Sequence, residues 1–231
     1  MPFFMSRFRS LFPTFWIALL PLWMACRHPA PPANPASSVP LNSEQIEAAF
    51  GSYGIDVIRQ DDGWRISNLH SVHEDTKICR TLAIVKMPSK VPGTIRRIHQ
   101  SILEGASIGA TFQSKGWQVV KTDHQVSRTD ELPEDSPIIA LMKNPLERRL
   151  PLHRYRLSVL KRDHRIPYAT IAEIHHPDYL NPDHLKRFYK IPHYQSSSDP
   201  DPDPMATTLI KLATRALQPH EAFLGEVHSD P

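Results

Sequence analysis

Alternation between apolar and polar residues marks two adjacent strands late in the chain. Leu157 and Val159 alternate with polar neighbours, which is the period-two pattern of a strand with one buried face. The segment 166–174 follows a short polar turn, so the two segments predict a β-hairpin. On its second strand, Glu173 points to the same face as Ile171. Because an ionised carboxylate seldom faces an apolar layer without a partner, Glu173 is the first candidate for a functional side chain.

A mostly apolar strand over 77–88 supplies a candidate partner for this glutamate. Arg80 lies two residues after Ile78 and two residues before Leu82, which predicts an inward-facing side chain. Two hypotheses stay open at this point. Arg80 and Glu173 form a structural ion pair, or Arg80 binds the carboxylate of a ligand through two hydrogen bonds while Glu173 contacts the ligand's other end.

The remaining hydrophobic pattern indicates an α+β protein. It predicts further strands over 53–60, 64–73 and 117–125, and helices over 41–50, 92–104, 182–189 and 207–217, with a helical turn over 110–114. Asn42 or Ser43 is expected to cap the first helix. The segment 127–151 is compatible with either a strand or a helix. We therefore expect one domain, an antiparallel β-sheet with helices packed on one face.

Composition narrows the function classes. The chain has 231 residues and a formal net charge of only +3, so there is no electrostatic footprint for nucleic acid, and we expect a monomer. The 13 histidines are scattered. His175 and His176 are strand neighbours that point opposite ways, so with Asp178 they do not predict a metal site. No glycine-rich phosphate loop occurs in the sequence, and no cofactor is expected.

The first 26 residues indicate export. Arg7 and Arg9 precede an apolar run that ends in Ala25-Cys26, which resembles the lipidation signal of bacterial lipoproteins, although Trp23 departs from it. Cleavage nearby and an uncleaved anchor are the alternatives. We expect lipidation of Cys26 and a membrane-anchored protein that faces the periplasm.

Changes in composition along the chain predict the domain organisation. A Pro-rich tether covers 27–41, the folded domain 42–195, a polar break 196–206, and a C-terminal helix and tail 207–231. If Cys26 is lipidated, Cys79 is a single thiol, and its apolar strand predicts that it is buried as a small hydrophobic residue.

Residues 53–180 resemble the chorismate–pyruvate lyase family, whose members make 4-hydroxybenzoate. The resemblance rests on the order of four segments: Ile55-Asp56-Val57-Ile58-Arg59, Cys79-Arg80-Thr81-Leu82-Ala83-Ile84-Val85, Ser107-Ile108-Gly109, and the hairpin that ends in Ile171-Ala172-Glu173-Ile174-His175-His176-Pro177. It implies a chorismate lyase-like fold without a cofactor.

The resemblance also implies residue roles. Arg80 and Glu173 would be catalytic, and amides near Val57, Ile108 and Gly109 would hold the carboxylate of a small aromatic or enol-ether ligand. Glu173 would serve as a general acid if burial raised its pKa.

The expected export of this chain differs from the location of the family, whose members are cytoplasmic. A related ligand-sensing module of some bacterial transcription regulators shares the fold without catalysis. The alternatives are therefore a non-catalytic periplasmic lipoprotein that binds a small aromatic carboxylate, and a structural envelope lipoprotein.

Overall fold

The structure is a computed structural model that describes residues 41–61, 63–190 and 204–218. The expected signal peptide, Cys26, the tether up to residue 40 and the polar break over 196–203 lie outside the described residues. Among the helices of the described part, none is long and apolar enough to cross a membrane.

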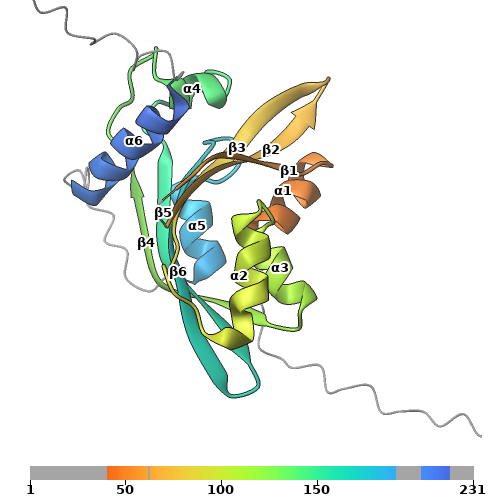
Figure 1. Cartoon of the computed structure of the whole chain (residues 1–231). Helices are drawn as coiled ribbons and strands as arrows, with labels where there is room; N and C mark the ends of the chain where they lie inside the picture. Colours follow the sequence, from red (N-terminus) through yellow and green to blue (C-terminus); the bar gives the residue numbers. More distant parts are fainter. Residues whose placement is uncertain (1–40, 62, 191–203, 219–231) are drawn as a thin grey trace, which may run out of the picture. The chain divides into compact units, whose positions relative to one another are not determined.

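Six strands form one antiparallel sheet in the order β1-β2-β3-β6-β5-β4 (Figure 1). Their bounds are β1 Gly54–Asp61, β2 Trp64–His73, β3 Thr76–Lys86, β4 Gln118–Arg128, β5 Pro151–Lys161 and β6 His164–His175. The predicted hairpin is the β5–β6 pair. The α+β class and the antiparallel sheet are thus confirmed.

The helices fall between and after these strands. Their bounds are α1 Asn42–Phe50, the 3-10 turn η1 Gly93–Ile95, α2 Arg96–Leu103, α3 Ile108–Ser114, α4 Pro137–Leu141, α5 Pro182–Tyr189 and α6 Pro204–Leu217. The undecided segment 127–151 therefore contains a short helix, and its Pro137 occupies a first-turn position, where proline is favourable.

Helices cover both faces of the sheet, which corrects the expectation of one face. Figure 1 shows α4 and α6 on one side and α1, α2 and α3 on the other. Strand residues alternate between two cores. Leu82 and Ile174 pack with α4 and α6, whereas Val85 and Ile171 pack with α2 and α3. The C-terminal helix buries Leu209 and Ala213 against the first core.

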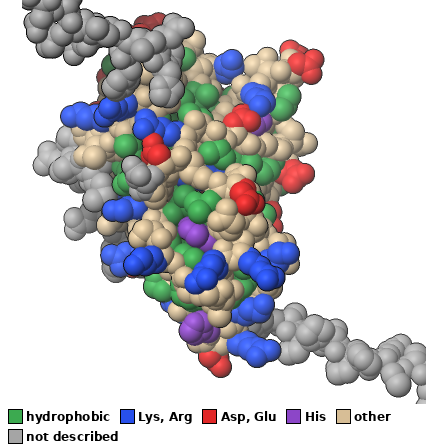
Figure 2. Space-filling view, viewed as in Figure 1, with side chains coloured by type: hydrophobic (Ala, Val, Ile, Leu, Met, Phe, Trp, Pro, Cys, Tyr) green, Lys and Arg blue, Asp and Glu red, His purple; other side chains and the backbone are tan. Residues whose placement is uncertain are grey.

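Two local expectations change in the structure. Asn42 is not the residue before the first helix but its first residue, and the backbone N–H of Leu41 donates to the Glu44 carboxylate at 2.8 Å. The helical turn expected over 110–114 begins two residues earlier, because residues 108 and 109 start α3. Cys79 is fully buried in the first core, as expected, and burial raises the pKa of its thiol. On the face seen in Figure 2, basic and acidic side chains are interspersed.

Candidate functional site

One row of residues crosses the sheet and sets the dimensions of the site. Ser67 pairs with Ala83, Ala83 with Glu173, and Glu173 with His153. Neighbouring strands are about 4.8 Å apart, so the backbones of Ser67 and Glu173 are separated by about 10 Å. The small side chain of Ala83 lies between them. This row therefore leaves room for a small molecule above the sheet.

A pocket occupies this space, with a cavity volume of about 80 Å³. A single water molecule needs only about 10–15 Å³ of such space, so the pocket can hold something larger. The sheet forms one wall, and the starts of α1 and α3 form the other. The lining residues are Leu41, Asn42, Ser43, Tyr53, Ile55, Arg65, Ser67, Leu69, Ala83, Val85, Ser107, Ile108, Gly109, Val119, Lys121, Tyr155, Leu157, Ile171 and Glu173.

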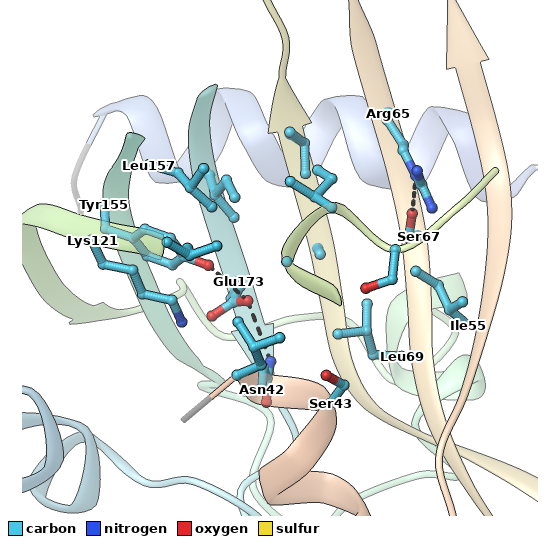
Figure 3. A pocket seen from close by; sticks show the side chains of 18 of the residues that line it. Asn42, Ser43, Ile55, Arg65, Ser67, Leu69, Lys121, Tyr155, Leu157 and Glu173 are labelled. Carbon is cyan, nitrogen blue, oxygen red and sulfur yellow. Dashed lines mark hydrogen bonds between the residues drawn. The ribbon is translucent and has the colours of Figure 1, made fainter. Parts of the chain in front are cut away.

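Glu173 marks one end of the pocket (Figure 3). The residue is 4 % exposed, and its Oε1 accepts hydrogen bonds from Asn42 Nδ2 at 3.3 Å and from the Tyr155 hydroxyl at 3.1 Å. The ammonium of Lys121 donates to the Tyr189 hydroxyl at 3.1 Å and lies over the Tyr155 ring, 4.6 Å from its centroid. This end therefore combines a carboxylate, an amide, a phenol and a cation.

The electrostatics keep Glu173 ionised. Burial raises the pKa of its carboxyl and is the largest single cause, but the Lys121 ammonium and the neighbouring His153 and His175 together outweigh it and hold the pKa well below its usual range. The condition for a general-acid role, a pKa raised by burial, is therefore not met, because a carboxylate that is already ionised near neutral pH has no proton to give.

Arg65 marks the opposite end of the pocket (Figure 3). It is 1 % exposed. Its Nε donates to Ser67 Oγ at 2.9 Å, and its Nη1 and Nη2 donate to the backbone carbonyls of Ile102, Gly105 and Ala106 at 2.8–3.1 Å. No carboxylate pairs with Arg65 among the residues that the structure describes. Four of the five guanidinium N–H groups are thus used by neutral acceptors.

Apolar side chains connect the two polar ends. Ile55, Leu69, Val85, Leu157 and Ile171 line the space between Arg65 and Glu173. They come from five different strands of the sheet. A molecule that fills the pocket would therefore have an apolar body and a polar group at each end.

Ile108 and Gly109, which the family resemblance implied as ligand-binding positions, line the pocket. A Cβ added at Gly109 would lie 2.7 Å from Leu41 Cδ2, so this position brings α3 close to the start of α1. Val57 does not line the pocket, and its side chain is 37 % exposed. Of the predicted site residues, the structure brings together Ile108, Gly109 and Glu173.

Arg80 lies elsewhere, which corrects its predicted place beside Glu173. Its guanidinium stacks 3.7 Å above the centroid of the Phe50 ring, and its Nε donates to Ser71 Oγ at 2.9 Å. It does not line the pocket, and no ion pair joins it to Glu173 in the described chain. The structural ion-pair hypothesis for these two residues is therefore wrong as well.

A cluster at the Glu173 end was also missed. His153, Glu173 and His175 each offer one ligand atom, and these atoms lie within 4.8 Å of one another. His175 was weighed only with its neighbour His176, because His153 is 22 positions away and reaches the cluster through strand pairing. Among the described residues this group has the donor atoms of a metal site.

Two solved structures are similar to part of this chain. No protein-family model matches the chain, and no curated protein matches it. One similar solved structure is that of PhnF from Mycobacterium smegmatis, with 16% identity, a TM-score of 0.36, and coverage of 62% of this chain and 66% of that one. Another is the C-terminal domain of the histidine utilization repressor from Pseudomonas syringae pv. tomato str. DC3000, with 10% identity, a TM-score of 0.30, and coverage of 56% and 90%. Similarity at this level assigns no function.

Proposed function

We propose that the pocket binds a small carboxylate with an aromatic or similarly apolar body. The observation that carries this proposal is Arg65, a buried guanidinium that lines an apolar pocket and has no carboxylate partner among the described residues. Burial of a cation without an anion is costly, because neutral acceptors replace only part of its hydration. An anionic ligand would supply the missing charge.

The groups around Arg65 suit a carboxylate. One N–H of the guanidinium has no hydrogen-bond partner among the described residues. The hydroxyl of Ser67 accepts from Arg65, so its own proton can be donated to a ligand oxygen. Tyr53 and Ser107 also line the pocket. A charged hydrogen bond of this kind contributes about 1.5–3 kcal/mol.

The Glu173 end suits a hydrogen-bond donor on the ligand. An ionised carboxylate only accepts hydrogen bonds, so Glu173 favours a ligand hydroxyl. The backbones of Ser67 and Glu173 are about 10 Å apart in the row that crosses the sheet, a spacing that suits a ligand of one ring with a polar group at each end. 4-Hydroxybenzoate has a carboxylate, one ring and a hydroxyl on the opposite side, and chorismate has related groups. These are the ligands that the sequence resemblance also implies.

Binding without turnover is the leading form of this proposal, and chorismate–pyruvate elimination is the second candidate. The resemblance over residues 53–180 favours elimination, with the substrate's own aromatisation as a driving force. The ionised state of Glu173 and the position of Arg80 outside the pocket favour binding alone. We further propose that lipidated Cys26 anchors the protein to a membrane and that the folded domain faces the periplasm.

Thermal unfolding of the full chain with two matched ligands tests the proposal. 4-Hydroxybenzoate should raise the melting temperature, with a stabilisation of about 2.7 kcal/mol at a hundred times its dissociation constant. 4-Hydroxybenzyl alcohol, which lacks the carboxylate, should have little effect at the same concentration. Equal shifts, or none, would contradict a carboxylate site. Pyruvate release from chorismate, measured on the same protein, separates the lyase from the binding protein.

A further inference from the structure

Three buried polar atoms converge at the Glu173 end of the site. They are His153 Nδ1, Glu173 Oε2 and His175 Nε2, and none of them has a hydrogen-bond partner among the described residues. The two nitrogens lie 3.7 Å and 3.8 Å from Oε2, which is too far for direct hydrogen bonds. The side chains of the two histidines are at most 1 % exposed. Buried polar atoms are normally satisfied, so this convergence needs an explanation.

The sheet places these atoms together. Glu173 and His175 are two residues apart on β6 and therefore face the same side. His153 on β5 is the direct cross-strand partner of Glu173. The cluster is thus built on paired strands in the middle of the sheet and is held by backbone geometry, as a preorganised ligand set requires.

The outer atoms of the same side chains already have partners. His175 Nδ1 lies 2.9 Å from Thr81 Oγ1, and His153 Nε2 lies 2.9 Å from His124 Nδ1. When each outer ring nitrogen carries the proton, both inner nitrogens present lone pairs to the gap. The other oxygen of Glu173 accepts from Asn42 and Tyr155. Such outer contacts orient ligands in metal sites.

We propose that His153, Glu173 and His175 bind one divalent transition-metal ion of the zinc class. The ligand atoms of a tetrahedral ion with bonds of about 2.0–2.2 Å are separated by about 3.3–3.6 Å. The two separations from Oε2 exceed this by a few tenths of an ångström, and the three atoms lie within 4.8 Å of one another, so an inward movement of the side chains closes the site around an ion. Two histidines and one carboxylate are a common ligand set for zinc and for non-haem iron. The competing occupant is a water molecule, which would bridge the same three atoms.

Zinc titration of the full chain, stripped of metal with a chelator, tests this proposal. The wild type should bind Zn²⁺ at this site, and His153→Gln and His175→Gln should each lose one equivalent, with affinity for that equivalent reduced more than about 100-fold, since loss of an outer contact alone costs 10–100-fold. His176→Gln is the matched control, because His176 is also buried and adjacent in sequence but is outside the cluster. It should keep the full stoichiometry.

Two further measurements guard against misfolded variants. Thr81→Val removes the hydroxyl beside His175 while preserving shape, and should weaken zinc binding by about 10–100-fold without removing a ligand. Co²⁺ added to the wild type should give the intense visible absorption of a low-coordinate site with nitrogen ligands. The same stoichiometry in wild type, His153→Gln and His175→Gln, or a wild type that takes up no zinc, would overturn the proposal and assign the gap to water.

Discussion

Loss of the Lys121 ammonium should destabilise the protein, because Glu173 would remain buried and ionised without its main opposing charge. Lys121 is partly buried, and its Nζ lies 4.6 Å from the centroid of the Tyr155 ring, while Glu173 is 4 % exposed. Removing one partner of a fully buried ion pair costs about 3–5 kcal/mol.

The expected cost of Lys121→Met is smaller than this limit. Asn42 and Tyr155 still donate to Glu173 in the variant, and partial exposure of Lys121 screens the interaction. We therefore expect a loss of about 1–3 kcal/mol in the free energy of unfolding at neutral pH. Glu173→Gln should also destabilise. The double variant should recover part of the loss, because neither unpaired charge then remains.

Urea unfolding of metal-free wild type, both single variants and the double variant completes a double-mutant cycle. Tryptophan fluorescence reports the transition, and equal slopes against urea validate the comparison. We expect a coupling energy of at least about 1 kcal/mol between the two positions. If the losses in the free energy of unfolding of the two single variants add up to that of the double variant within about 0.5 kcal/mol, the electrostatic account of this end of the pocket is refuted.

Three further predictions concern pH, the buried thiol and the anchor. Burial lowers the pKa of His175 to about 3 and of His124 to about 4, so below about pH 6.5 the unfolded chain binds more protons than the folded one. The melting temperature should fall between about pH 6.5 and pH 4, and His175→Gln should reduce the fall; a flat profile would contradict this. In a Cys26→Ser background, Cys79 should resist thiol reagents until the protein unfolds, since its thiol is buried and its pKa is raised; rapid labelling of folded protein would be inconsistent with this. Cys26→Ser should itself release the protein from membranes, and an unchanged membrane fraction would refute lipidation.

Period-two alternation was enough to find Glu173. The hairpin that carries it is regular around the site, so a residue two positions from Ile171 must face the same way. The strands and most helices were predictable for the same reason, because each has a clear apolar face. The second helix layer was not predictable, because a strand's two apolar faces do not show which helices will cover them.

The prediction for Arg80 failed because of a β-bulge. Leu69 pairs with Thr81, but the next residue, His70, pairs with Cys79, so Arg80 is an extra residue in its strand. The alternation counted from Ile78 therefore does not continue through this position. A bulge of this kind depends on the pairing of two strands, so the sequence of one strand alone does not reveal it.

Arg65 was overlooked for a different reason. It alternates with Ser67 and Leu69 along β2, and a strand face that contains Arg and Ser is ordinarily the exposed one. In the structure that face lies under α2 and α3, and three backbone carbonyls near the end of α2 accept from the guanidinium. The signal available in the sequence was the apolar Leu69 on the same face.

Calorimetric titration of 4-hydroxybenzoate into three proteins tests the central claim, that Arg65 makes this pocket a carboxylate site. The proteins are the wild type, Arg65→Gln and the control Arg80→Gln, each first shown to be folded by circular dichroism. Loss of a charged hydrogen bond worth about 1.5–3 kcal/mol predicts binding roughly tenfold to a hundredfold weaker in Arg65→Gln. Arg80→Gln should bind nearly as well as the wild type, because Arg80 does not line the pocket. Equal affinity in the wild type and Arg65→Gln, with weak binding only in Arg80→Gln, would contradict the account.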